Sequence, residues 1–140
     1  MGYHFEGLLG KEKSLKAFQN LHPECQIVNL HQDLFVIPFV EEKIQKTDSI
    51  NSEIKKISQL DKIAYLEACF HGGSGYQNAE LYENGLCRVF KDDRNAFNKI
   101  LKIFEVYAKW FKDEFDTVNF GRHRKTEDWL NSEEIYQKNL

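Results

Sequence analysis

The feature of the sequence that most constrains its fold is a series of short apolar segments separated by glycine turns in the middle of the chain. In Ile63–Phe70 both sets of alternate side chains are largely apolar, which is typical of a strand buried on both faces in the centre of a sheet. The flexible turn Gly72–Gly75 leads into a predicted strand at Gln77–Tyr82. Asn84-Gly85 is a strong signal for a two-residue hairpin, and Leu86–Phe90 follows it. These segments predict a three-stranded antiparallel meander.

The N-terminal part of the chain predicts further strands. Aromatic and apolar residues alternate with polar ones over residues 2–9, which favours a first strand. Apolar, largely β-branched side chains predict two more strands, Ile27–Leu30 and Leu34–Val40, joined by a tight turn. Pro38 has no amide hydrogen, so we expect the second of these strands to lie at a sheet edge or to end in a bulge.

Apolar side chains at helical spacing predict three helices. They cover Ser14–Leu21, Ile50–Leu60, and a long amphipathic stretch from Ala96 to Phe111 that should pack across the sheet. The candidate N-caps are Asp48 or Ser49 for the second helix and Asp92 or Asn95 for the third.

The arrangement of these elements predicts the fold class. No segment of the 140 residues repeats, and no linker separates two regimes of composition. We expect a single α+β domain over residues 1–140, with a mostly antiparallel sheet of about five or six strands and two to four helices packed on it. The simplest assembly places those helices on one face. Residues 131–140 are polar, and we expect them to fray.

Composition and charge exclude several classes of protein. Apolar residues make up 41% of the chain and aromatic residues 14%, which argues against disorder. The net charge of −3 lacks the basic excess that binding to a phosphate backbone requires, so we expect no direct contact with nucleic acid. The longest apolar run, Leu34–Val40, is far shorter than the roughly 20 residues of a membrane span, and the N-terminus lacks a signal peptide. We therefore expect a cytoplasmic protein with no membrane partner.

The cysteines and histidines predict neither a metal site nor a cofactor. Cys25, Cys69 and Cys87 form no CxxC pair, and the five histidines show no HExxH or HxH spacing. Reduced thiols, buried or half-buried, are the simplest interpretation.

His71-Gly72-Gly73-Ser74-Gly75 is similar to the serine-hydrolase motifs HGGG and GxSxG, but it satisfies neither. The second motif needs glycine where Tyr76 stands and must join a strand to a helix, whereas here a strand follows. A hairpin turn is therefore the favoured interpretation, and a loop that contacts a ligand or partner is the alternative. The residues of this structural turn or ligand loop are Glu67, His71, Gly72, Gly73, Gly75 and Gln77.

Glu67 is the most unusual acid in the sequence, because it lies in a predicted central strand, where a carboxylate is costly unless it is paired. A structural partner such as Arg or Tyr is the favoured interpretation. The alternative is a general acid or base with a raised pKa.

The C-terminal segment from Phe115 to Trp129 is dense in polar and aromatic side chains. Thr126 can cap a short helix, and Trp129 can anchor that helix on the core. A sharper interpretation is a protein interface, since Arg and Trp dominate interface energetics. The candidate partner-binding residues are Asp113, Glu114, Asp116, Arg122, His123, Arg124, Glu127 and Asp128.

Two stretches carry a resemblance to a protein family. Ile63–Ala79, in which a strand ending in an acidic residue and aromatics runs into a GGxGxQ-A turn, resembles small bacterial immunity proteins of polymorphic or contact-dependent growth-inhibition toxin systems. Asp113–Asp116 and Gly121–Trp129, with its sequence GRHRKTEDW, resemble the C-terminal end of the same group. The resemblance covers roughly a quarter of the chain. It implies stoichiometric binding and neutralisation of a cognate toxin domain in the bacterial cytoplasm, without catalysis.

Two other functions stay open. A small enzyme or ligand-binding domain would need Glu67, His71, Gln77 and the 122–128 segment to converge on a pocket. An oligomeric regulatory domain would need a self-complementary patch of exposed aromatics such as Tyr76 and Tyr82. For a toxin that attacks nucleic acid, an acidic C-terminal surface could plug a basic cleft through complementary charge.

Overall fold

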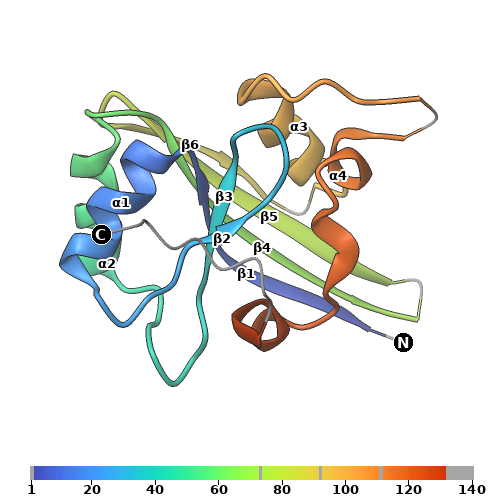
Figure 1. Ribbon diagram of the computed structural model, residues 1–140, viewed down its shortest axis with the longest axis horizontal. Helices are drawn as coiled ribbons and strands as arrows, with labels where there is room; N and C mark the ends of the chain where they lie inside the picture. The colour runs from blue at the N-terminus through green and yellow to red at the C-terminus, as the bar shows by residue number, and fades with distance from the viewer. Residues whose placement is uncertain (1, 73, 92, 111, 132–140) are drawn as a thin grey trace.

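The computed structural model describes residues 2–72, 74–91, 93–110 and 112–131 as one α+β unit (Figure 1). Its centre is a six-stranded sheet in the order β2-β3-β1-β4-β5-β6, and all of its neighbouring strands are antiparallel. The strands are β1 (Tyr3–Gly10), β2 (Val28–Asn29), β3 (Phe35–Pro38), β4 (Ile63–His71), β5 (Ser74–Glu83) and β6 (Leu86–Phe90). The predicted fold class is confirmed.

The predicted meander is present, with longer strands than expected. His71 pairs with Ser74, so β4 and β5 extend up to the glycine turn, and Gly72 has a φ of +54°. Asn84 and Gly85 both adopt positive φ, as a type I′ turn requires, and Glu83 pairs with Leu86 across them. The strand β4 lies between β1 and β5, which confirms its central position.

The N-terminal strands differ from the expectation in length and in the position of Pro38, since β2 and β3 are both shorter than the predicted Ile27–Leu30 and Leu34–Val40. The strand β3 lies between β2 and β1, so Pro38 is not on an edge strand. Pro38 is instead the last residue of β3 and lies opposite Gly7. A Cβ at Gly7 would approach the Ile37 carbonyl oxygen to 2.4 Å, so glycine permits this close approach of the two strands.

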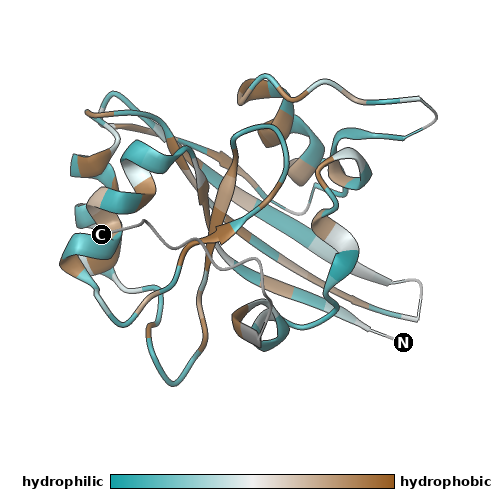
Figure 2. Cartoon of the chain, viewed as in Figure 1, coloured by the Kyte–Doolittle hydropathy of each residue, from teal (hydrophilic) through white to brown (hydrophobic). Residues whose placement is uncertain are grey.

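The helices cover both faces of the sheet, and the prediction of a single covered face is wrong. The helices α1 (Glu12–Leu21) and α2 (Asp48–Ile57) pack on one face, where Leu8 and Ile63 point. The helix α3 (Ala96–Ile103) packs on the other, where Phe5 and Leu66 point. The apolar sides of these helices turn toward the sheet (Figure 2). Two cores form because β1 and β4 present apolar side chains at both sets of alternate positions.

Two helix ends also differ from the predictions. Thr47, rather than Asp48 or Ser49, is the N-cap of α2, and its Oγ1 accepts a hydrogen bond from the Ile50 amide at 3.1 Å. The helix α3 ends at Ile103 instead of reaching Phe111, which lies outside the described residues. After α3 the chain reverses at Glu105, whose φ is +65°.

The C-terminal segment closes the core on the α3 side. It contains α4 (Glu114–Thr117) and the short 3-10 helices η1 (Phe120–Arg122) and η2 (Thr126–Asn131). Trp129 is fully buried edge-to-face against Phe5 and Phe120, so the predicted anchor is confirmed. Thr126 is the first residue of η2, and its hydroxyl contacts His4, with 3.0 Å between Oγ1 and Nδ1. The predicted frayed tail falls, from residue 132 onward, outside the described residues.

Candidate functional site

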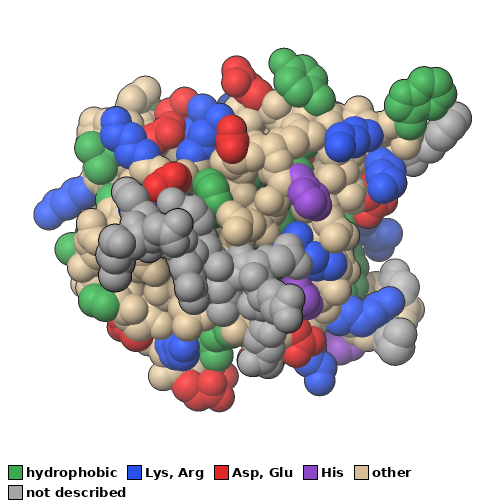
Figure 3. All heavy atoms as spheres, viewed as in Figure 1, with side chains coloured by type: hydrophobic (Ala, Val, Ile, Leu, Met, Phe, Trp, Pro, Cys, Tyr) green, Lys and Arg blue, Asp and Glu red, His purple; other side chains and the backbone are tan. Residues whose placement is uncertain are grey.

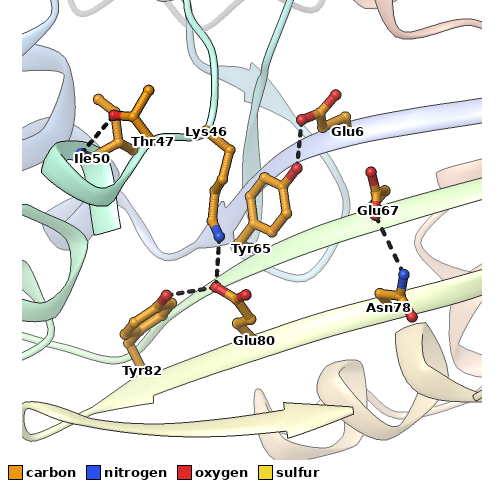
Figure 4. A network of polar contacts seen from close by, with 9 residues as sticks. All are labelled: Glu6, Lys46, Thr47, Ile50, Tyr65, Glu67, Asn78, Glu80 and Tyr82. Carbon is orange, nitrogen blue, oxygen red and sulfur yellow. Dashed lines mark hydrogen bonds and ion pairs between the residues drawn. The ribbon is translucent and has the colours of Figure 1, made fainter. Parts of the chain in front are cut away.

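Polar side chains gather on the α1–α2 face of the sheet, beyond its apolar part (Figure 4). Glu6 on β1, Glu67 on β4 and Asn78 on β5 lie opposite one another in one row across the three strands. Tyr65 and Glu80 form the next row. Antiparallel partners point to the same face, so the strand register alone brings these five side chains together.

Hydrogen bonds and one ion pair connect this group. The Tyr65 hydroxyl donates to Glu6 at 2.5 Å, and the Tyr82 hydroxyl donates to Glu80 at 2.6 Å. Lys46 Nζ lies 2.8 Å from the same Glu80 carboxylate and 4.4 Å from the centre of the Tyr65 ring. Each of these two carboxylates therefore has a donor within the protein.

The two tyrosines in this network remain protonated at physiological pH. Burial raises the pKa of Tyr65 far above its ordinary value of 10.0, and the hydrogen bond to Glu6 raises it further. Burial also raises the pKa of Tyr82, with a second contribution from Glu80. Both hydroxyls are thus permanent donors, which suits a network that fixes side-chain positions.

Glu67 occupies the central strand as predicted, but its partner is neither Arg nor Tyr. Asn78 Nδ2 donates to Glu67 Oε1 at 3.3 Å, and the carboxylate is half-exposed. It lines a hollow of about 270 Å³ together with Asn78, Glu80 and Lys91. Because the side chain reaches the surface of the sheet, it avoids the burial cost that the sequence suggested.

The residues proposed for an enzyme do not converge on one pocket. His71 lies on the same face of β4 as Glu67 but four residues further on, about 13 Å along an extended strand. Gln77 points to the opposite face, where its Oε1 accepts the Phe97 amide at 2.9 Å at the start of α3. His123 lies edge-on to the Trp129 ring, with 4.8 Å between ring centres.

The glycine turn carries Ser74 at an exposed hairpin tip. Its hydroxyl donates to the His71 carbonyl oxygen at 3.2 Å. Gly75 permits a close approach of the strands, because a Cβ there would lie 2.2 Å from the Cys69 carbonyl oxygen. Gly73 lies outside the described residues. The contacts of Gly72, Ser74 and Gly75 are those of a hairpin turn.

The eight candidate partner-binding residues divide into internal and exposed groups. Asp113 caps α4 by accepting the Asp116 amide at 2.9 Å, and Glu114 is buried. Arg122 donates to the Asn29 carbonyl oxygen and lies over the Trp129 ring, with 4.5 Å to the ring centre. These contacts stabilise the fold. The exposed members of the set are Asp113, Asp116, Arg124, Glu127 and Asp128.

The exposed aromatic residues lie on the loop between α3 and α4, a surface that the sequence did not single out. Tyr107 is 80% exposed and Trp110 is 86% exposed. Hydrophobic side chains protrude over this region, at the upper right of Figure 3. The periodicity predicted Tyr107 to be buried in a long helix, and the early end of α3 places it in solvent instead.

Distant segments hold the backbone of this aromatic loop. The Gln32 side-chain amide donates to the Tyr107 carbonyl oxygen at 3.1 Å and accepts the Tyr107 amide at 3.0 Å. The Lys109 amide donates to Thr117 Oγ1 at 2.9 Å. Gln32 itself has a φ of +61° in the turn before β3, and no sequence pattern indicated that it would reach a residue 75 positions away.

The remaining expectations concern cysteines, metals and membranes. All three cysteines are free thiols; Cys25 is buried and Cys69 half-buried, but Cys87 is exposed, which differs from the prediction. In the described part of the chain no cluster of three or more His, Cys, Asp or Glu side chains could hold a metal ion. Among those same residues no helix has the length and apolar character to cross a membrane.

Comparisons with known proteins identify no relative. No protein family, no curated protein and no solved structure matches this chain.

Proposed function

We propose that the chain is a binding protein of the immunity type, which neutralises a cognate toxin domain by forming a stoichiometric complex in the bacterial cytoplasm. The observation that supports the proposal best is the exposed aromatic pair, Tyr107 and Trp110, on a loop whose backbone is hydrogen-bonded at several points. The resemblance of Ile63–Ala79 and Gly121–Trp129 to immunity proteins supplies the class of partner.

Exposing large aromatic side chains to water is unfavourable in the isolated protein, and burying them in a complex is favourable. Burying apolar surface contributes about 25 cal/mol per Å², and Tyr and Trp are enriched among residues that dominate interface energies. Both rings also suit an interface with a polar rim, because the Tyr hydroxyl and the Trp indole N–H can form hydrogen bonds with water or with a partner group. Tyr107 and Trp110 therefore suit the centre of a protein interface.

Other parts of the chain also hold the backbone of the loop at two of its residues. Gln32 fixes the Tyr107 backbone through two hydrogen bonds, and Thr117 fixes Lys109. A loop that is already held in place loses less conformational entropy on binding, which increases affinity.

The charges around the loop differ from the expected acidic surface that would bind a basic cleft of the toxin. Lys109 and Lys112 flank Trp110, while Asp113 follows as the N-cap of α4 and Asp116 lies within that helix. The neighbourhood thus carries both signs. We propose that the aromatic rings supply most of the affinity and that the exposed acids, including Glu127 and Asp128 elsewhere on the C-terminal segment, affect the association rate.

Co-expression with the C-terminal domain encoded directly upstream tests this proposal. We expect a one-to-one complex in size-exclusion chromatography and rescue of growth. Trp110→Ala and Tyr107→Ala should each weaken the complex by more than about tenfold, corresponding to about 1.4 kcal/mol. Leu60→Ala, at an apolar residue that is 53% exposed beyond α2, is the matched control and should bind normally.

Two results would count against the proposal. Absence of both complex and rescue would refute neutralisation of that toxin domain. A complex that tolerates both aromatic substitutions would refute the assignment of the α3–α4 loop as its centre.

A further inference from the structure

The two edges of the sheet are protected very differently. At one edge, β2 has only two residues; Val28 is fully buried, and Arg122 donates to the Asn29 carbonyl oxygen. At the other edge, β6 has five residues, four of them exposed, including Leu86 at 75% and Val89 at 61%. The strand order places no strand beyond β6 among the described residues.

The sequence of β6 has few of the devices that normally prevent an edge strand from pairing. It contains no proline and no lysine, and its single charge is Arg88. Val89 and Phe90 have high strand propensity. We propose that β6 is a self-association surface, at which two copies of the chain pair antiparallel about a two-fold axis at Val89 and form one continuous sheet.

The hairpin geometry determines which backbone groups of β6 are available. Glu83 and Leu86 flank the type I′ turn and form a hydrogen-bonded pair, so Leu86, Arg88 and Phe90 direct their amides toward β5. The amides of Cys87 and Val89 therefore point outward. In a dimer centred on Val89, this residue would exchange both backbone hydrogen bonds with its own copy.

Side chains favour this register over those centred on Arg88 and Cys87. Residues that pair across two antiparallel strands must point to the same face of the sheet. The two-fold axis that relates the copies must therefore pass through a residue of β6 and not between two residues. An axis at Arg88 would place two guanidinium groups side by side, which is unfavourable. An axis at Cys87 would pair Val89 with Gly85, which belongs to the turn and has a φ of +79°.

The axis at Val89 instead creates complementary pairs. Val89 meets Val89, and each Arg88 meets Phe90 of the other copy. Arg88 already lies over its own Phe90 ring, 4.9 Å from the ring centre, so the same cation–π contact can form across the axis. This self-association goes beyond the proposed toxin binding, because β6 shares no residue with the loop that carries Tyr107 and Trp110.

The mass of the full chain in solution, measured by light scattering or sedimentation over a concentration series, tests the proposal. The wild type should rise from 16.5 kDa toward the dimer mass as concentration increases. Val89→Pro removes an outward amide and leaves the pairing with β5 intact, so it should raise the dimer dissociation constant more than about tenfold. Val89→Thr keeps the amide and the branched side chain and should still dimerise.

A second variant covers the case in which Val89→Pro disturbs the fold. Val89→Lys keeps the amide but places two like charges opposite each other, and it should also be monomeric. Circular dichroism verifies that each variant is folded. A wild type that stays monomeric at every concentration, or a dimer that persists in folded Val89→Pro or Val89→Lys, would overturn the proposal.

Discussion

At the scale of single residues, the polar group on the sheet face is a network of satisfied contacts. Tyr65 bonds Glu6, Tyr82 bonds Glu80, and Lys46 neutralises Glu80. The sequence singled out Glu67 from its place in a central strand, and the structure places it in this group. The sequence could not indicate which side chains would contact Glu67 and its neighbours. Those contacts depend on the register between β1, β4 and β5, which the pattern of one strand does not specify.

The raised tyrosine pKa values predict a pH dependence of stability. A group whose pKa is higher in the folded state than its ordinary value of 10.0 stabilises the fold fully below that pH, and this contribution is lost as pH rises beyond it. The free energy of unfolding should therefore fall in alkaline solution. Tyr65→Phe should flatten this fall and, at neutral pH, cost on the order of 1 kcal/mol, because Glu6 loses its donor.

Urea unfolding at a series of pH values up to the alkaline range measures this effect. Tyr107→Phe, at an exposed phenol, is the matched control and should follow the wild type. Each variant differs from the wild type at one tyrosine only, so the difference between the curves isolates that tyrosine. Parallel curves for wild type and Tyr65→Phe would contradict the prediction.

At the scale of elements, sequence patterns predicted strand positions better than helix ends. The Asn84-Gly85 turn and the apolar segment Ile63–Phe70 were sufficient to place β4, β5 and β6, because both signals are local. The end of α3 was missed because the apolar periodicity continues beyond it. Beyond the end of α3 the reversed chain buries Val106 and exposes Tyr107, which the helical periodicity had placed on the apolar side.

The reversal after α3 gives a prediction about Glu105. The Val106 amide donates to the Leu101 carbonyl oxygen at 3.0 Å and the Glu105 amide to Lys102 at 2.9 Å, the pattern of a Schellman cap. This cap places Glu105 at a φ of +65°, where a Cβ is unfavourable. Glu105→Gly should raise the free energy of unfolding by about 1 kcal/mol.

Glu105→Ala is the control, because it removes the same carboxylate but keeps the Cβ. Chemical denaturation of both variants separates the backbone effect from the charge effect. Equal stabilities of the Gly and Ala variants would show that the positive φ is not a source of strain.

At the scale of the whole molecule, one sheet serves two cores. The strands β1 and β4 contribute Leu8 and Ile63 to the core under α1 and α2, and Phe5 and Leu66 to the core under α3 and η2. A strand that loses its packing on one face cannot keep its position on the other. We therefore expect the two cores to unfold together, although different segments of the chain cover them.

Trp129 provides the test, because it belongs to only one core and contacts Phe5 on β1. Trp129→Ala should lower the free energy of unfolding by about 3–5 kcal/mol, and Trp129→Phe by less, since a ring still fills the site. For the most protected α2 amides, on the opposite face, the free energy of hydrogen exchange should fall by the same amount, so exchange should accelerate about tenfold for each 1.4 kcal/mol lost. If these amides kept their wild-type exchange rates in Trp129→Ala, the two cores would be separate units. The sheet would then be a shared scaffold rather than the element that couples them.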